Sequence, residues 1–437
     1  MNLLSISPVD GRYHNQTQFL SDYFSEFALI KARVYVELQY LISLSKLGIF
    51  TIDSSKIEQI YSEFDYQEAL RVKEIESTTK HDVKAVEYYL KQKMQSLCPD
   101  KTEWVHFGLT SQDINNVAIP YLLKSFITQV YLSKLNKVVD KLNSLSNDWF
   151  KVPMLSRTHG QPASPTTMGK ELMVFVERLE NQIDLLNCIP DTGKFGGAVG
   201  NFNAHYVAFP DINWVKFADD FLLNSFGLIR QRYTTQIEHY DNMGAIFDTI
   251  KRINVILMDL SRDMWQYISL DYFKLKRLEN EIGSSTMPHK VNPIDFENAE
   301  GNLGIANANF EHLSSKLPQS RLQRDLTDST VLRNIGVPIS HTIISINSLL
   351  KGLDKLVLNQ EKIGEDLDNN WVVITEAIQT ILRREGYGSA YEKVKEITKN
   401  EVSHQVIVNF IMNLDVTDSV KSELLDITPQ NYIGFLK

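Results

Sequence analysis

Apolar residues recur at alternating spacings of three and four along most of this chain. The clearest stripes run from Ile127 to Trp149, from Leu172 to Leu186, from Ile246 to Met264 and from Ile346 to Val357. This spacing places each stripe on one face of a helix. Its mean period, about 3.5 residues, is typical of long helices that pack nearly parallel in a bundle. Period-two alternation is scarce, so we predict an all-α fold.

The lengths of the predicted helices change twice along the chain. Residues 1–108 hold shorter helices, one of which covers about Val34 to Leu47 and ends at Gly48, a residue type that often caps helix C-termini. Residues 109–362 carry the long stripes, and residues 363–437 return to shorter helices. We therefore predict an N-terminal helical domain, a central long-helix bundle domain and a C-terminal helical domain. The broad apolar faces of the long helices also predict an oligomer.

Composition excludes several classes of protein. The 437 residues carry a formal net charge of −9, which argues against a nucleic-acid partner. The two cysteines, Cys98 and Cys188, exclude a disulfide scaffold and a cysteine-based zinc cluster, and they fit a reducing cytosol. We find no secretion signal and no run of about 18 apolar residues that would predict a membrane span. We therefore expect a cytoplasmic protein without a membrane partner.

Residues 283–293 form the segment richest in candidate chemistry. The segment reads Gly-Ser-Ser-Thr-Met-Pro-His-Lys-Val-Asn-Pro. Its last residues predict a helix start, with Asn292 as N-cap and Pro293 as the first helical residue. Because a helix N-terminus favours negative charge, this segment and its one fixed cation, Lys290, suit an anionic substrate. The alternative is an ordinary polar surface loop.

Two polar clusters precede apolar helical patterns, at Thr79–Asp82 and Thr110–Asp113. Both match the capping box, in which an N-cap threonine and an acid three residues later satisfy backbone N–H groups. The capping box explains the two acids as well as a binding role does, but it requires neither His81 nor Ser111.

Candidate proton-transfer residues lie elsewhere. His159 sits beside a glycine in a loop bounded by Pro153 and Pro162, and the ordinary histidine pKa of about 6.5 suits proton transfer near neutral pH. Glu297 lies seven residues after Lys290, one turn into the helix that Asn292 is predicted to cap, where a carboxylate can orient a histidine. The alternatives are a structural histidine and a solvated glutamate.

The run from Arg321 to Arg333 carries three arginines, whose forked donors bind phosphate and carboxylate groups. Asp325 and Asp328 offer an alternative, since they would neutralise the arginines in a surface network. Arg12, next to an aromatic residue, is another candidate cation. The sequence has neither a P-loop nor a Gly-x-Gly-x-x-Gly fingerprint, so we predict no nucleoside triphosphate or dinucleotide site.

Taken together, these segments resemble the adenylosuccinate lyase family in its longer bacterial form. Residues 283–293 match the signature Gly-Ser-Ser-x-Met-Pro-x-Lys-x-Asn-Pro of the wider fumarase/aspartase superfamily. Ser7–Tyr13 and Arg324–Arg333 point to this family rather than to fumarase, aspartase or argininosuccinate lyase. The resemblance covers nearly the whole chain. Its other segments are 81–87, 110–116, 156–162 and 234–238.

The resemblance implies a three-domain, all-α homotetramer whose active sites are each built from three subunits, with no cofactor and no metal. It implies cleavage of adenylosuccinate to AMP and fumarate. It also implies cleavage of succinylated aminoimidazole carboxamide ribotide (SAICAR) to its amide (AICAR) and fumarate. Both reactions belong to purine biosynthesis.

The resemblance also implies roles by position. Ser284 matches the general base, His159 the general acid and Glu297 the carboxylate that orients the histidine. Residues matched to the succinyl carboxylates are Lys290, Asn292, Thr110, Ser111 and Thr158. Residues expected to line the substrate are Lys80, His81, Asp82 and Gln236. Those expected at the phosphate and nearby groups are Arg12, Tyr13, Arg324, Ser329 and Arg333. Further matched binding positions are Asn298 and Thr330.

Two departures from the family pattern stand out. Lys80 occupies a position where relatives often carry asparagine, and it adds a cation beside His81. His239-Tyr240-Asp241 replaces an expected Pro-His-Asp, which predicts a shifted local loop. Two other interpretations stay open: another fumarate-releasing lyase of the superfamily, such as an argininosuccinate lyase, and a non-catalytic structural protein on the same fold.

Overall fold

The computed structural model describes residues 3–277, 287, 289–399 and 401–434, and these fold into two compact units. Unit 1 contains the residues up to Asn136, Gln182–Leu257 and Ala299–Asn347. Unit 2 contains Lys137–Asn181, Met258–Asn298 and the residues from Ser348 onward. The predicted division into three domains stays a prediction.

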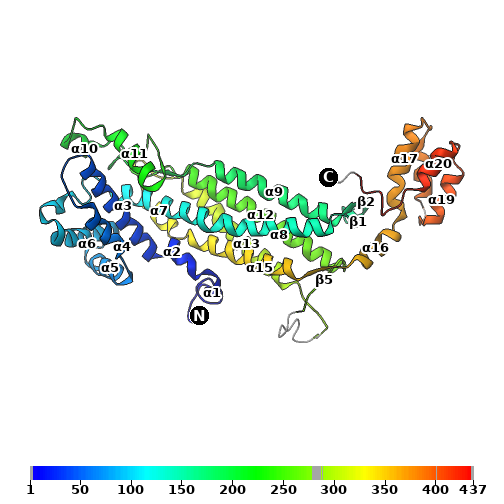
Figure 1. Cartoon of the computed structure of the whole chain (residues 1–437), viewed down its shortest axis with the longest axis horizontal. Helices are drawn as coiled ribbons and strands as arrows, with labels where there is room; N and C mark the ends of the chain where they lie inside the picture. The colour runs from blue at the N-terminus through cyan, green and yellow to red at the C-terminus, as the bar shows by residue number, and fades with distance from the viewer. Residues whose placement is uncertain (1–2, 278–286, 288, 400, 435–437) are drawn as a thin grey trace. The chain divides into compact units, whose positions relative to one another are not determined.

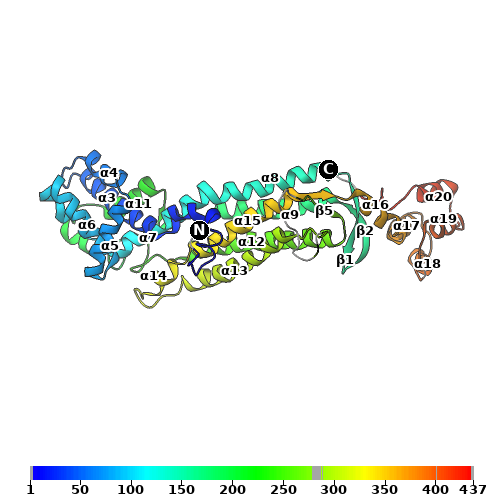
Figure 2. The ribbon, with the colours of Figure 1, turned by 90° about the horizontal axis from the view of Figure 1, so that it is seen from below.

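Unit 1 is mainly helical. The helices that lie wholly within this unit are α1 (His14–Thr17), η1 (Gln18–Leu20), α2 (Ser21–Phe24), α3 (Glu26–Lys46), α4 (Ser54–Ser62), α5 (Tyr66–Thr79), α6 (Asp82–Leu97), η2 (Pro99–Trp104), α7 (Ser111–Phe126), the π-helical η3 (Ile127–Tyr131), α10 (Asn203–Ala208), α11 (Trp214–Phe226) and α14 (Thr327–Leu332). A short parallel pair joins β3 (Thr192–Gly193) to β4 (Ile229–Arg230). Figures 1 and 2 show α4, α5 and α6 close to α3. The apolar core runs through α3, α6, α7 and α11.

Unit 2 adds two antiparallel strand pairs to its helices. The pairs are β1 (Pro153–Thr158) with β2 (Gln161–Thr167), and β5 (Phe273–Leu275) with β6 (Leu356–Leu358). Its shorter helices are α16 (Gln360–Asp368), η4 (Trp371–Ile374), α17 (Thr375–Arg384), α18 (Ala390–Ile397), α19 (His404–Met412) and α20 (Asp418–Leu425). A second apolar core joins these C-terminal helices, with Ile374, Ile378 and Leu382 fully buried.

Long helices contribute residues to each unit. They are α8 (Leu132–Trp149), α9 (Met168–Cys188), α12 (Asp241–Ser269), α13 (Ile294–Lys316) and α15 (Gly336–Lys355). Within unit 1, Phe247 of α12 stacks on Phe310 of α13 with ring centroids 5.7 Å apart. Within unit 2, Arg178 of α9 pairs with Asp259 of α12 at 2.6 Å. These contacts and Figure 1 confirm the predicted all-α fold with packed long helices.

The predicted helical stripes lie largely on buried faces. Leu135, Val138 and Leu142 have no exposed surface. The predicted stripe from Ile346 to Val357 is wrong at its end, because α15 ends at Lys355 and Val357 belongs to β6, where it is 42% exposed. The predicted cap is confirmed, since Gly48 follows α3 with a left-handed φ of +79°. Among the described helices, none is both long and apolar enough to cross a membrane.

Candidate active site

Asp82, at the first turn of α6, receives two arginines. Arg33 of α3 donates its Nη2 to Asp82 Oδ2 at 2.7 Å, and Arg333 donates its Nη2 to the same oxygen at 3.2 Å. Arg33 is only 2% exposed, and its Nε donates to Asn115 Oδ1 of α7 at 2.8 Å. Burial alone would raise the pKa of Asp82, but the arginine charges outweigh it and hold that pKa below its ordinary value.

The N-terminus of α6 differs from the predicted capping box. His81, not Thr79, is the N-cap, because its Nδ1 accepts a hydrogen bond from the Lys84 N–H at 3.1 Å. The capping-box explanation of Asp82 is therefore wrong: Asp82 accepts from the Val83 N–H and from two arginines. Lys80 ends α5 with a left-handed φ of 55°. Asparagine adopts that conformation more readily than lysine does.

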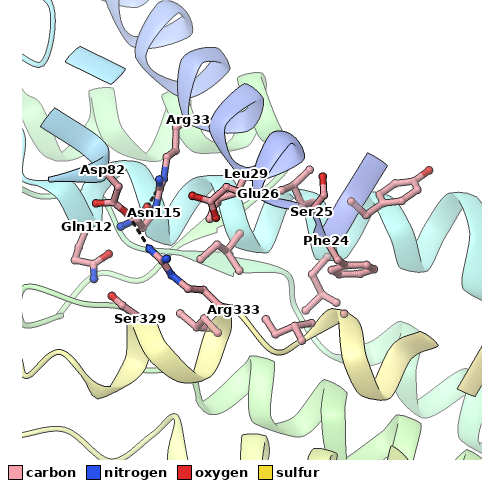
Figure 3. A pocket seen from close by; sticks show the side chains of 17 residues that line it. Phe24, Ser25, Glu26, Leu29, Arg33, Asp82, Gln112, Asn115, Ser329 and Arg333 are labelled. Atoms are coloured by element: carbon pink, nitrogen blue, oxygen red, sulfur yellow. Dashed lines mark hydrogen bonds and ion pairs between the residues drawn. The ribbon is translucent and has the colours of Figure 1, made fainter. Parts of the chain in front are cut away.

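A pocket of about 140 Å³ opens beside this cluster (Figure 3). Its polar side includes Asp82, Ser329 and Arg333, and its apolar side includes Phe24 and Leu29. The lining residues come from α2, α3, α6, α7, α14 and the turn after α14. The pocket therefore joins residues that are far apart in sequence.

The N-terminal segment lies next to Arg333. Ser7, Asp10 and His14 share an open groove with Arg333. Arg12 belongs to the same segment, and its side chain is exposed. Tyr13 is half-buried beside it. Both predicted phosphate residues of this segment thus lie in the same unit as the arginine run.

The arginine run brings three predicted binding residues together. Arg324 donates its Nη2 to Ser329 Oγ at 3.1 Å and its Nη1 to Gln236 Oε1 at 3.4 Å. Its buried Nε has no partner within the described part of the chain. Arg321 forms an exposed ion pair with Asp325 at 2.9 Å, and Arg324 Nη2 lies 3.9 Å from Asp328 Oδ1, so the predicted aspartate network describes both arginines. Thr330, the remaining predicted residue of the run, is exposed.

Tyr240, one of the departures from the family pattern, has a defined place. Its side chain is buried, and its backbone has a left-handed φ of 63°. The hydroxyl accepts from Asn116 Nδ2 at 2.6 Å and donates to Asp328 Oδ2 at 2.9 Å. Burial and the Asp328 carboxylate raise the pKa of Tyr240, so the hydroxyl stays a neutral donor. Sequence reasoning did not identify this link.

The capping box at the start of α7 is confirmed for Thr110 and Asp113. The Thr110 N–H donates to Asp113 Oδ2 at 2.9 Å. Lys194, which sequence reasoning missed, also donates its Nζ to Asp113 Oδ1 at 2.7 Å, and neither side chain has any exposed surface. Burial lowers the pKa of Lys194, although Asp113 opposes that shift.

The buried Lys194–Asp113 pair also supports a glycine-rich turn. The N–H groups of Gly196 and Gly197 donate to Asp113. Ala198, the next residue in that turn, accepts from Gln236 Nε2 at 3.1 Å. Asp113 contacts Thr110 and this turn, and Gln236 contacts both the turn and Arg324. Thr110, which with Ser111 is predicted to bind the substrate carboxylates, is therefore connected through these contacts to the arginine run.

In unit 2, His159 lies at the tip of a β-hairpin. Thr158 pairs with Gln161, so His159 and Gly160 form a two-residue turn. Their φ values of 53° and 75° are those of a type I′ turn, and histidine tolerates the left-handed conformation better than most residues. The glycine-flanked turn is confirmed, but strands, not a loop, lead into it. Both His159 and Thr158 are exposed.

The hairpin is attached to α16, as Figure 1 also shows. Arg157, two residues before His159, pairs with Asp366 at 3.5 Å. Asp366 also accepts from the Tyr272 hydroxyl at 3.0 Å and pairs with Lys362 at 3.0 Å. A single carboxylate therefore connects the strand that carries the histidine to a C-terminal helix.

The start of α13 carries the other predicted residues of unit 2. The helix begins at Ile294, one residue later than predicted, because the Pro293 carbonyl accepts from the Glu297 N–H at 3.3 Å. Glu297 accepts from Trp265 Nε1 at 3.0 Å, and Asn298 donates to Ser348 Oγ at 2.7 Å. No hydrogen bond joins Glu297 to His159 among the described residues.

The predicted residues thus fall into two sets. Unit 1 holds Arg12, Tyr13, Lys80, His81, Asp82, Thr110, Ser111, Gln236, Arg324, Ser329, Thr330 and Arg333. Unit 2 holds Thr158, His159, Lys290, Asn292, Glu297 and Asn298; Lys290 is exposed and Asn292 half-buried. Ser284 lies outside the described residues.

Comparison with known proteins gives a consistent result. A family described as lyase matches residues 11–306, and one described as adenylosuccinate lyase C-terminal matches residues 320–433. A relative from Dictyostelium discoideum named adenylosuccinate lyase is 55% identical, over 100% of this chain and 97% of the relative. The protein of that name from Escherichia coli K12 is 46% identical, over 99% of this chain and 97% of its own.

Solved structures show the same fold at lower identity. The 3-carboxy-cis,cis-muconate lactonizing enzyme from Pseudomonas putida superposes with a TM-score of 0.72, covering 95% of this chain and 96% of its own, at 18% identity. The chain therefore belongs to the adenylosuccinate lyase family of carbon–nitrogen lyases, within the fumarase/aspartase superfamily.

Proposed function

We propose that this chain cleaves adenylosuccinate to AMP and fumarate, and SAICAR to AICAR and fumarate. The observation that carries this proposal is 46–55% identity, across essentially the whole chain, to relatives named adenylosuccinate lyase. The cluster of Arg324, Ser329 and Arg333 supports it, because forked arginine donors beside a hydroxyl suit the phosphate that both substrates carry.

The proposed reaction is an anti β-elimination across a C–N bond. A base removes a proton from the carbon next to a carboxylate, which gives a dianionic aci-carboxylate. The C–N bond then breaks, fumarate forms, and an acid protonates the departing nitrogen. The intermediate concentrates negative charge, so preorganised donors stabilise it most.

We assign the base to Ser284 and the acid to His159. A serine hydroxyl is a weak base until a neighbouring group activates it. His159 is presented on a two-residue turn, which restricts its backbone and leaves the imidazole accessible. Glu297 is proposed to orient that imidazole in the assembled site.

The binding roles follow the two sets of residues. Lys290 and Asn292 of unit 2, with Thr158 and with Thr110 and Ser111 of unit 1, are proposed to hold the succinyl carboxylates. Arg12, Tyr13, Arg324, Ser329 and Arg333 are proposed to hold the phosphate. His81, Gln236, Asn298 and Thr330 are proposed to line the substrate.

We further propose that the enzyme is a cytoplasmic homotetramer whose active sites combine residues of three subunits. The exposed position of His159 on its hairpin supports this, because proton transfer works best in a site shielded from water. The exposed apolar side chains Val255 and Trp265 of α12 and Ile305 of α13 also fit contacts with other subunits.

Fumarate release from the purified protein tests the proposed function. Adenylosuccinate, argininosuccinate and malate are supplied in parallel, and fumarate is followed by its absorbance. Release from adenylosuccinate alone is the expected result. Release from another substrate alone would favour a different lyase of the superfamily. No release from any of them would favour a non-catalytic structural protein.

A further inference from the structure

Asp82 has little acceptor capacity left for a substrate. Its Oδ2 accepts from both Arg33 and Arg333, and its Oδ1 accepts from the Val83 N–H at 2.9 Å. Figure 3 shows the two arginines reaching the carboxylate from opposite sides. Two guanidinium groups therefore face the Asp82 carboxylate, while Glu26 contributes a second carboxylate to the pocket lining.

The two arginines differ in exposure. The Arg33 side chain is 3% exposed, whereas that of Arg333 is 50% exposed. Arg33 of α3 links two other helices, because its Nε donates to Asn115 of α7 while its Nη2 donates to Asp82 of α6. A guanidinium is planar and rigid, so this double contact fixes the position of the Asp82 carboxylate.

An exposed arginine samples many rotamers unless a partner restrains it, and ordering it upon binding costs entropy. Asp82 supplies such a restraint for Arg333. Since Arg333 also lines the pocket with Ser329, its restrained guanidinium lies where an anionic group would enter.

We propose that Arg33 is a positioning residue for the phosphate site. It fixes Asp82, and Asp82 in turn holds the guanidinium of Arg333 ready for the phosphate. From the sequence, Asp82 is expected to contact the substrate; in this proposal Asp82 instead holds Arg333, which contacts the substrate. The inference rests on the proposed function, which places the substrate phosphate at Arg324, Ser329 and Arg333.

The decisive variant is Arg33→Lys, which keeps the charge but loses the fork that bridges Asn115 and Asp82. Arg230→Lys is the matched control. Arg230 is also a buried arginine of unit 1, and its Nε donates to a half-exposed carboxylate, that of Asp219, at 2.7 Å.

Calorimetric titration with inorganic phosphate measures the site directly, and fumarate release from adenylosuccinate gives KM and kcat. We expect Arg33→Lys to weaken phosphate binding and raise KM by about fivefold to tenfold, with kcat changed less than about threefold. Arg230→Lys leaves phosphate binding and KM unchanged. An equal loss in both variants would mean a general loosening of unit 1 and would overturn the proposal, as would unchanged binding in Arg33→Lys.

A double-mutant cycle with Asp82→Asn tests the route of the effect. Asp82→Asn removes a negative charge near the phosphate, so a purely electrostatic role predicts tighter phosphate binding. A positioning role predicts weaker binding, because Arg333 is released. If Arg33 acts through Asp82, the double variant loses about as much as the worse single variant. Tighter binding in Asp82→Asn, or fully additive losses, would contradict the proposal.

The two readouts separate this inference from the proposed function. Wild-type protein that releases no fumarate, yet binds phosphate in a way that depends on Arg33, contradicts the proposed function alone. Wild-type protein that cleaves adenylosuccinate with a KM insensitive to Arg33→Lys contradicts the inference alone. Failure of the wild-type protein to bind phosphate overturns the inference as well.

Discussion

The two units hold their candidate residues in different ways. In unit 1, the predicted binding residues rest on buried ion pairs: Arg33 is 2% exposed, and Lys194 and Asp113 are completely buried. In unit 2, His159 lies on an exposed hairpin turn, and Glu297 has an exposed side chain on the first turn of α13. The proposed phosphate contact Arg333 is thus supported by buried charges in unit 1, whereas the proposed acid His159 and its proposed partner Glu297 are exposed in unit 2.

The two kinds of residue have different physical requirements. A phosphate site works at a half-exposed position, because arginine charges act over several ångströms. A general acid gains most of its effect in a site that excludes water. The arrangement in unit 2 therefore fits the proposed site that other subunits complete.

The largest effect is expected for His159→Ala. Loss of a general acid lowers kcat by about 10²–10⁴-fold, while substrate binding through unit 1 persists. Steady-state fumarate release gives both kcat and KM. His404→Ala is the control, since His404 stacks on Trp371 elsewhere in unit 2 with ring centroids 4.3 Å apart. Near-normal kcat in His159→Ala would remove it as the acid.

Mixing the two catalytic variants tests whether subunits share sites. Ser284→Ala alone is expected to abolish turnover. If base and acid come from different subunits, mixed tetramers of Ser284→Ala and His159→Ala contain some intact sites and recover part of the activity. Subunit exchange is verified by mass spectrometry. Exchange without recovered activity would count against shared sites.

A large effect on stability is expected for Lys194→Met. The substitution leaves the Asp113 carboxylate buried without its cation, which lowers the free energy of unfolding by about 3–5 kcal/mol. Urea denaturation measures the change. Lys216→Met is the matched control, because the Lys216–Asp220 pair has the same kind of contact, at 2.8 Å, but lies on the surface. Its expected effect on stability is small, because a solvent-exposed ion pair contributes little to the free energy of unfolding. Equal losses would contradict the special role of the buried pair.

A moderate effect is expected for Asp366→Asn. The substitution weakens the contacts of Arg157 and Tyr272, so the hairpin that carries His159 is less firmly held. We expect kcat to fall by about tenfold with little change in KM, because a displaced hairpin misplaces His159, the proposed acid, and leaves the proposed phosphate-binding residues of unit 1 in place. Glu365→Gln, on the exposed side of the same helix, serves as the control. A change confined to KM would place Asp366 in binding instead.

The smallest effect concerns the Glu37–His106 pair of unit 1, whose Oε1 and Nδ1 atoms are 2.5 Å apart. Burial alone would lower the pKa of His106, but Glu37 outweighs it and the pKa is raised. A raised histidine pKa stabilises the fold fully below the unfolded value of about 6.5, and this stability is lost as pH rises through the folded pKa.

Glu37→Gln should therefore lower the free energy of unfolding by about 1–2 kcal/mol more at pH 5.5 than at pH 9. Urea denaturation at the two pH values measures the difference, with wild-type protein as the reference. A cost that does not depend on pH would show that the histidine charge contributes nothing.

Local patterns in the sequence predicted local features well. The three-and-four spacing identified the long helices, and the Thr110–Asp113 spacing identified a true capping box. His159 and Gly160 were placed in a turn, which the hairpin confirms. Each of these depends on residues a few positions apart, where backbone geometry limits the outcomes.

Contacts between distant residues were not predicted. Lys194 reaches Asp113 across 81 positions, and Arg33 reaches Asp82 across 49. Nothing in the local sequence distinguishes such a buried charge from one in solvent. The wrong cap at Asp82 has a related cause, since Thr79 and His81 are both capable of starting the helix and only the fold selects between them.

Equilibrium binding of adenylosuccinate to two variants tests whether phosphate binding by Arg333 of unit 1 is separate from proton transfer by His159 of unit 2. Calorimetry compares His159→Ala with Arg333→Ala, each against wild-type protein under conditions that limit turnover. We predict that His159→Ala binds within about threefold of wild type, whereas Arg333→Ala binds about tenfold more weakly or worse. Equal losses in both variants, or a larger loss in His159→Ala, would contradict the account.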